Sequence, residues 1–241
     1  MELLADALDV AVVWEPLHAT SGVVPDDFGW GWRPSLQLGE ESNDQRAFFH
    51  AVHGYELHNE WTRMMLTPRA ARSADRALVK YVRANGLVDV LLDSIEFRSP
   101  PIYLLRHPID TCLSQMRAFG ASGPSLEERV SDWCAVNCPV IDRRASELTM
   151  VHYEDLVTRP LEELTRIVAA TGTSPRVALE SLDFARSSAT DFRNEKRSVG
   201  DEQLRKNIDE LSPGEKSAIQ EIFDEHGLIK YSAFSATPQS I

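Results

Sequence analysis

The stretch YLLRHPIDTCLSQMRAFG, residues 103–120, decides the fold class. Its apolar start, 103–105, is typical of a covered parallel strand. Pro108 ends that strand and begins a turn, because proline cannot continue the hydrogen bonding of a sheet. Apolar residues then recur at helical spacing over 109–119. Arg106 therefore stands at the carboxyl end of a strand and just before a helix, where open α/β sheets bind ligands, so we expect an anion site there.

Three further apolar runs, at 10–14, 77–82 and 148–152, also predict strands, and helical patterns lie between them. Strands that alternate with helices indicate an α/β fold with a mostly parallel sheet, here within a single domain over 1–241. The carboxyl ends of parallel strands share one edge, so polar residues that follow them can converge on one crevice. These residues are Glu15, Lys80, Arg83, Arg106, Tyr153 and Glu154.

The composition narrows the class of protein and of site. The formal net charge of −12 argues against general affinity for nucleic acid or for an anionic membrane, so any anion site must be a local cluster of cations. Three cysteines are too few and too odd in number for a disulfide framework, and their spacing does not favour a metal site. We therefore expect buried thiols in a reducing compartment. The sequence has no apolar run long enough to span a membrane and no signal-peptide pattern, which predicts a cytoplasmic protein.

Four segments, in the same order as in that family, resemble sulfotransferases that use 3′-phosphoadenosine 5′-phosphosulfate, of the carbohydrate and bacterial type. They are LLADALDVAVVWEPLH at 3–18, LVKYVRAN at 78–85, IYLLRHPIDTCLSQMRAFG at 102–120 and VHYEDLVTRP at 151–160. The resemblance implies a sheet like that of P-loop nucleotide-binding proteins. It also implies transfer of a sulfonate group to a hydroxyl of a carbohydrate or of a glycosylated or other small molecule, without a metal.

The resemblance assigns the nucleotide's 3′-phosphate to Arg106 and Ser114. Arg197, with Ser198 and Gly200 beside it, is similar to the family's later basic loop that closes over that phosphate, and Tyr153 is a candidate contact of the nucleotide. The residues alone leave simpler interpretations open. Arg106 can pair with Asp110 while Ser114 lies on the helix surface, the loop can be solvated, and Tyr153 can belong to the core.

Glu15 is the candidate general base of the transfer, because a carboxylate must take the acceptor hydroxyl's proton as the new bond forms. His18 is the competing base. Lys80 and Arg83 could neutralise charge on the sulfonate or contact an anionic acceptor. The alternative for Glu15 is a structural role in which it holds the following loop. His18 can be merely a polar neighbour of that loop, and Lys80 an ordinary lysine of an edge strand. The tryptophans that could stack on a sugar, or merely anchor a long loop, are Trp30, Trp32 and Trp61.

One departure from the family's pattern concerns the loop of the type R-S-G-[ST]-[ST], which binds the 5′-phosphosulfate through backbone N–H groups. It would lie just before the helix that begins this sequence, a helix without an N-cap residue, so we interpret the first strand and its loop as missing. Sulfonate transfer by this chain is then expected to be negligible, with weak 3′-phosphate recognition retained through Arg106 and Ser114. A degenerate nucleotide-binding paralogue stays open as an alternative. So does another nucleotide-dependent transferase, such as a small-molecule kinase.

Overall fold

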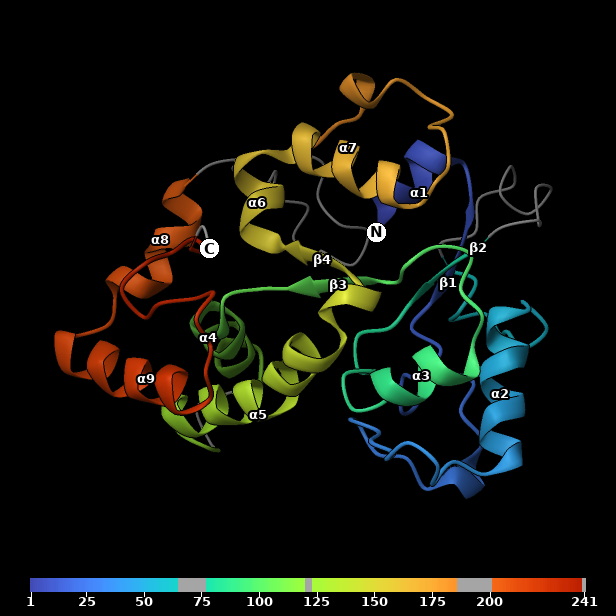
Figure 1. The fold of residues 1–241 in the computed structure, drawn as a ribbon, viewed down its shortest axis with the longest axis horizontal. Helices are drawn as coiled ribbons and strands as arrows, with labels where there is room; N and C mark the ends of the chain where they lie inside the picture. The colour runs from blue at the N-terminus through green and yellow to red at the C-terminus, as the bar shows by residue number, and fades with distance from the viewer. Residues whose placement is uncertain (65–76, 120–122, 186–200, 240–241) are drawn as a thin grey trace. The chain divides into compact units, whose positions relative to one another are not determined.

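The computed structural model describes residues 1–64, 77–119, 123–185 and 201–239 (Figure 1). It is an α/β protein whose chain divides into two compact units. The first unit consists of 1–99 with 168–182, and the second of 100–167 with 183–241. The α/β class expected from the sequence is therefore confirmed, and small parallel sheets occur in both units.

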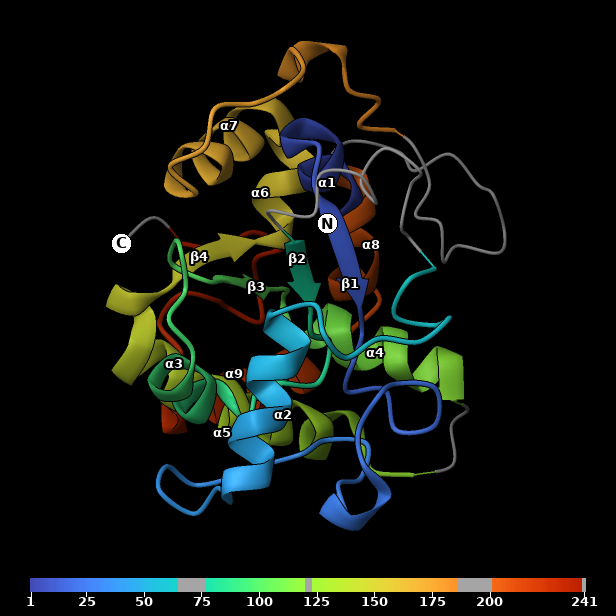
Figure 2. The ribbon, with the colours of Figure 1, turned by 90° about the vertical axis from the view of Figure 1, so that its right-hand side faces the viewer.

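The described residues of the first unit form a two-stranded parallel sheet, whose two strands lie side by side in Figure 2. Ala11 pairs with Ala77 at one end of the sheet and Trp14 with Lys80 at the other. The elements of this unit in chain order are α1 (Glu2–Leu8), β1 (Ala11–Trp14), a 3₁₀ turn (Asp26–Phe28), α2 (Asn43–His53), β2 (Ala77–Lys80), α3 (Val88–Ser94) and a second 3₁₀ turn (Leu179–Ser181).

The core of the first unit forms where β1, α2 and α3 bury their apolar residues together. All four residues of β1 are buried, as expected of a strand covered on both faces. Helix α2 begins at a capping box, in which the Ser42 hydroxyl accepts from the backbone of Gln45 and the Gln45 side chain accepts from the backbone of Ser42. This start sets the helix so that Phe48, Phe49 and Val52 face the core.

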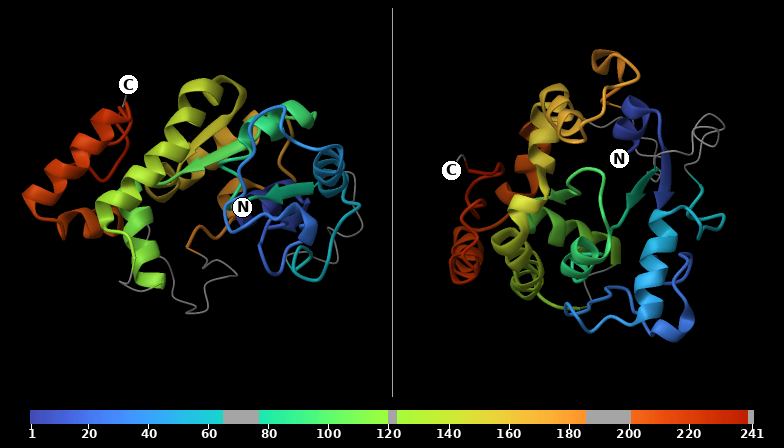
Figure 3. Two further views of the ribbon diagram at one scale, coloured as in Figure 1. Left: turned by 90° about the horizontal axis from the view of Figure 1, so that it is seen from below. Right: turned by 45° about the vertical axis from the view of Figure 1, so that its right-hand side comes forward.

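The second unit holds the other parallel pair, in which Ile102 lies opposite Thr149 and Leu105 opposite His152. Helix α4 packs against α5 and α8, and α5 packs against α9, as can be followed in Figure 3. The remaining elements are β3 (Ile102–Leu105), α4 (Pro108–Phe119), α5 (Leu126–Arg144), a 3₁₀ turn (Ala145–Glu147), β4 (Thr149–His152), α6 (Tyr153–Thr158), α7 (Pro160–Ala170), α8 (Asp201–Asp209) and α9 (Pro213–Glu225). The last part of α7, from Val168 on, belongs to the first unit.

The core of this unit includes the cysteines. Cys112 of α4 and Cys134 and Cys138 of α5 are buried and form no disulfide within the described residues, and their burial is as the sequence predicted. They pack with Ile109 and with Phe223 of α9 in one apolar cluster. The hydrogen bond with the neighbouring Cys138 thiol, and then burial, raises the pKa of the Cys134 thiol. These cysteines therefore serve packing.

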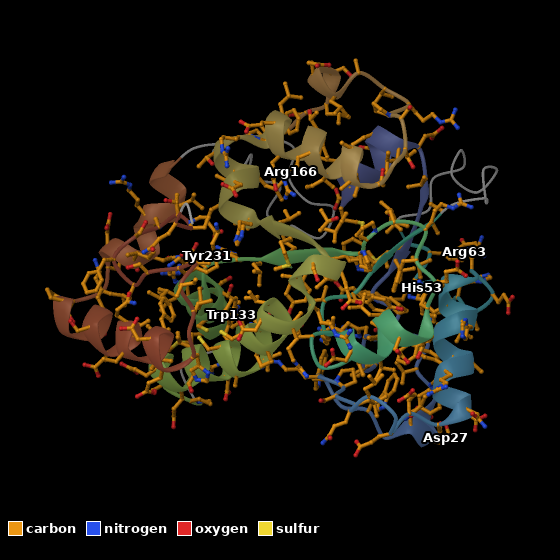
Figure 4. All side chains as sticks on the ribbon, viewed as in Figure 1. Asp27, His53, Arg63, Trp133, Arg166 and Tyr231 are labelled. Atoms are coloured by element: carbon orange, nitrogen blue, oxygen red, sulfur yellow. The ribbon has the colours of Figure 1, made fainter. Side chains whose placement is uncertain are left out.

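A buried polar cluster joins the turn after β3, the start of α6 and the chain beyond α9. The Glu154 carboxylate accepts from the His107 backbone N–H at 2.7 Å and from the Tyr231 hydroxyl at 3.1 Å. The Tyr231 hydroxyl also lies 2.8 Å from His152 Nδ1, and its ring packs edge-on to Trp133, its neighbour in Figure 4. Because Glu154 is 1% exposed, burial raises its pKa, and these two donors partly offset the cost.

The structure confirms the four strands expected from the sequence to within two residues, but not every property expected of them. They form two separate two-stranded sheets within the described residues. The expectation that 103–105 is covered is wrong for Leu104, which is 56% exposed because the side chains of β3 alternate between a packed and an open face. Helix α6 begins directly at Tyr153, where the sequence indicated only a strand end.

No helix in the described part of the chain is both long and apolar enough to cross a membrane.

The burial of His107 generates a pH prediction. Burial lowers the pKa of this imidazole from 6.5 to about 4, its Nδ1 accepting from the Ile109 N–H and its Nε2 facing the Ser232 carbonyl. Since the folded pKa is depressed, the stability it supports is present above pH 6.5 and is lost as the pH falls toward 4. The free energy of unfolding of the wild type should therefore fall between pH 7 and pH 4.5. In His107→Gln this fall, measured by urea denaturation, should be smaller by about 2 kcal/mol.

The reference for this prediction is the pH dependence of unfolding of the wild-type chain over the same pH range. Burial also lowers the pKa of His53 on α2 (labelled in Figure 4) to about 4, so part of the acid sensitivity should persist in His107→Gln. A full wild-type loss of stability in that variant would contradict the assignment.

Candidate functional site

Glu15 follows the last residue of β1 and has an unusual backbone. Its φ of 39° lies in the left-handed region, which residues other than glycine rarely adopt. The Glu15 N–H donates to the Lys80 carbonyl at 3.0 Å, while the preceding Trp14 N–H donates to the Thr62 carbonyl at 2.8 Å. The surrounding hydrogen bonds thus hold a strained conformation, a feature that clusters at functional sites.

Two cations flank the Glu15 carboxylate, one on each oxygen. Lys80 Nζ lies 3.2 Å from Oε1, and Arg83 Nη1 lies 3.2 Å from Oε2. Each cation also faces an indole ring, since Lys80 Nζ is 3.4 Å from the Trp14 ring centre and Arg83 Cζ is 4.8 Å from that of Trp32. The sequence expected these three charged residues to come together, and within the first unit they do.

Burial lowers the pKa of Lys80, and the attraction of two carboxylates, Glu15 and then Glu2, opposes that shift. The side chains of Lys80, Arg83 and Glu15 remain partly exposed, at 25%, 22% and 14%. The carboxyl end of the β1–β2 sheet therefore presents two partly exposed cations beside a carboxylate.

His18 lies at the start of the loop after Glu15, between two tryptophan rings. Its ring centre is 5.2 Å from that of Trp32 and 4.8 Å from that of Trp61. Nδ1 accepts from the Ser21 N–H at 3.2 Å, which assigns the proton of the neutral ring to Nε2. Partial burial, and then repulsion by the Arg83 charge, lowers the pKa of His18. The neutral ring therefore presents a hydrogen-bond donor at Nε2, not an unoccupied nitrogen that could act as a base.

The tryptophans expected to form one platform separate into two groups. Trp30 packs against Phe28, Phe48 and Phe49 and belongs to the core. Trp32, 55% exposed, and Trp61 instead contact His18. Trp61 also lines an open hollow of about 560 Å³ together with Ser21, Asn59, Glu60 and Met64. An aromatic ring among amide, hydroxyl and carboxylate groups suits a hydroxylated ligand.

Asn59 ties the rim of this hollow to the turn after Glu15. Its side-chain amide donates to the carbonyls of Ser21 and Gly22 at 3.0 and 2.9 Å. Its Oδ1 accepts from the Thr62 N–H, and Thr62 in turn bonds to β1 through its carbonyl. Nothing in the sequence indicates this role, because Asn59 stands in no motif and its contacts lie 37 and 38 residues away.

Arg106 occupies the carboxyl end of β3 in the second unit, as expected. Its guanidinium carbon lies 4.8 Å from the ring centre of Tyr153, the residue that follows β4. Its Nη2 donates to Asp110 Oδ2 at 3.2 Å, the pairing that the sequence left open as the simpler interpretation. The side chain is nevertheless 36% exposed, so the pairing leaves part of the guanidinium open to solvent.

The other residues assigned to the 3′-phosphate are not all placed. Ser114 is exposed on α4, one turn beyond Asp110. Arg197, Ser198 and Gly200 lie outside the described residues. Glu154, expected at the crevice, is instead buried in the cluster around Tyr231. No group of three or more histidine, cysteine or acidic side chains that could hold a metal ion occurs in the described ranges.

Comparisons with protein-family models, with curated proteins and with solved structures found no match to this chain.

Gly22 closes the turn that carries Glu15 and His18, and this closeness generates a prediction. A Cβ at this position would meet the carbonyl oxygen of Pro16 and would lie 2.6 Å from that of His18. Gly22→Ala should therefore open the turn and lower the unfolding free energy by about 2 kcal/mol or more. It should also change the tryptophan fluorescence, because His18 would move against Trp32 and Trp61.

Gly31→Ala is the matched control for this prediction, since a Cβ there meets no atom of the described structure within 4 Å. Wild-type fluorescence and stability in Gly22→Ala would show that the turn does not depend on this contact.

Proposed function

We propose that the protein is a sulfotransferase that moves a sulfonate group from 3′-phosphoadenosine 5′-phosphosulfate to a hydroxyl of a carbohydrate or a glycosylated or other small-molecule acceptor. The observation that carries the proposal is Arg106, a partly exposed arginine fixed at the carboxyl end of a parallel strand and followed at once by helix α4. That position is where parallel α/β sheets bind anionic ligands. The resemblance of the four sequence segments names the anion as a nucleotide 3′-phosphate.

The donor set around Arg106 fits such a group. Guanidinium binds phosphate through paired N–H donors, and Tyr153 supports one face of it. Tyr153, which already packs against the Arg106 guanidinium, would also contact the nucleotide. Ser114 adds an exposed hydroxyl on α4, available for a further hydrogen bond.

Glu15, Lys80 and Arg83 would serve the transfer itself. The acceptor hydroxyl oxygen forms a bond to sulfur as the bond between sulfur and the phosphate oxygen breaks, and adenosine 3′,5′-bisphosphate leaves with that electron pair. The Glu15 carboxylate takes the hydroxyl proton. Lys80 and Arg83 lie 3.2 Å from this carboxylate, so they can neutralise negative charge on the moving sulfonate beside it. The hollow beside Trp61 is the proposed seat of the acceptor.

A nucleotide-binding protein without transfer activity is the second candidate. The observation in its favour is the pairing of Glu15 with two cations at once, because a carboxylate so engaged is less available to a proton. Both candidates predict recognition of the 3′-phosphate. Transfer of radiolabelled sulfonate from the donor to a panel of mono- and disaccharides distinguishes them.

The proposed 3′-phosphate contact predicts the effect of Arg106→Ala. This change should weaken binding of adenosine 3′,5′-bisphosphate by about 1.5–3 kcal/mol, the range for hydrogen bonds to charged groups. Binding of adenosine 5′-monophosphate, which lacks the 3′-phosphate, should change little. Isothermal titration calorimetry measures both, and equal wild-type affinity for the two nucleotides would refute the proposal.

The proposed base predicts the effect of Glu15→Gln on transfer. Loss of a general base costs about 10²–10⁴ in rate, so whatever rate of sulfonate transfer the wild-type chain has should fall by that order in Glu15→Gln. Nucleotide affinity should hold. Glu40→Gln, at an exposed position, is the matched control and should keep the wild-type rate. A Glu15→Gln variant that transfers as fast as the wild type would remove Glu15 from the mechanism.

A further inference from the structure

The carboxylate of Asp110 binds two partners, one with each oxygen. Oδ2 accepts from Arg106 Nη2 at 3.2 Å, and Oδ1 accepts from Asn207 Nδ2 at 2.7 Å. Asp110 lies in the first turn of α4, and its side chain is 3% exposed. A buried carboxylate is costly unless it is paired, and here a cation, an amide and the positive end of the helix dipole share that task.

Asn207 is fixed in turn, so its amide has one orientation. Its Oδ1 accepts from Arg117 Nη1 at 2.7 Å, which leaves its nitrogen to donate to Asp110. Arg117 continues to Glu210 through its other terminal nitrogen at 3.0 Å. A chain of hydrogen bonds therefore runs from the end of β3 through α4 to α8, across 97 residues of sequence between Asp110 and Asn207.

We infer that Asp110 and Asn207 are positioning residues for the 3′-phosphate, which hold the Arg106 guanidinium in the orientation that receives it; the inference rests on the proposed function. An arginine side chain is rich in rotamers, so a free one would lose conformational entropy on binding. Asp110 binds one terminal nitrogen of the Arg106 guanidinium, and the Tyr153 ring packs against one face of that group. Arg106 Nε is buried and has no hydrogen-bond partner in the described part of the chain, so the guanidinium is not fully satisfied by its own protein neighbours.

The role of Asn207 is to keep Asp110 in place. With Asn207 bonded to Oδ1, the carboxylate cannot turn away from Arg106 without losing a bond in a buried setting. Asp110 itself repels a phosphate. The hydrogen bond from the Asn207 amide and the positive end of the α4 dipole stabilise the charge of Asp110 in the buried interior. The guanidinium of Arg106 is then the group that meets the ligand.

The test compares two nucleotides rather than one, because a merely structural role would lower affinity for both. In the full chain, Asp110→Asn should lower affinity for adenosine 3′,5′-bisphosphate about tenfold and leave that for adenosine 5′-monophosphate nearly unchanged. Asn207→Ala removes the bond that holds Asp110 but leaves Asp110 and Arg106 themselves unchanged, and it should lower the ratio of the two affinities about threefold. Asp155→Asn is the matched control: it breaks another aspartate–arginine pair of the same unit, with Arg159, and should leave the ratio as in the wild type.

A double variant separates positioning from stability. In an Arg106→Ala background, Asp110→Asn should no longer change the ratio of the two affinities, because the guanidinium it holds is gone. Thermal unfolding of each variant identifies any loss of folding, and Asn207→Ala keeps the test open if Asp110→Asn does not fold. An unchanged ratio in both single variants, with Arg106→Ala still abolishing discrimination, would overturn the inference and leave the proposed function standing. Absence of discrimination in the wild type would overturn the proposed function itself.

Discussion

The hydrogen bond and ion pair that Asp110 makes with Arg106 is the interaction on which the proposed 3′-phosphate site depends. It fixes a long, flexible cation at the end of β3, and it does so from a carboxylate that solvent barely reaches. Asn207 completes the arrangement from α8, so the orientation of Arg106 depends on the packing of α4 against α8. A surface pair of the same spacing would contribute little, because solvent would screen it.

Three carboxylates near strand ends have three different environments, and these decide their roles. Glu154 is buried and accepts from a backbone N–H and a tyrosine, so it serves the fold. Asp110 is buried but holds a partly exposed cation. Glu15 lies between two cations with its backbone in the left-handed region, and it is the carboxylate of the three that solvent and a substrate reach most readily. Position along a strand does not separate these cases, whereas burial and partners do.

The strands and most helices could be predicted from the sequence, because their signals are local. Apolar runs mark the four strands, and a serine three residues before a glutamate, as Ser212 and Glu215 are at the start of α9, is the pattern of a capping box. Strand pairing was not local: 10–14 pairs with a strand more than sixty residues away, and no periodicity states which strands share a sheet. The pairs of Glu15 with Lys80 and Arg83 followed from their place at strand ends. Asn207 did not, because its partner lies on another helix and no motif contains it.

A crystal structure of the chain with adenosine 3′,5′-bisphosphate would show where the 3′-phosphate binds. We expect the 3′-phosphate within hydrogen-bond distance of Arg106, with the guanidinium still paired to Asp110 and stacked on Tyr153. A 3′-phosphate bound elsewhere, at Lys80 and Arg83 for example, with Arg106 making no contact to the nucleotide, would refute the proposed site.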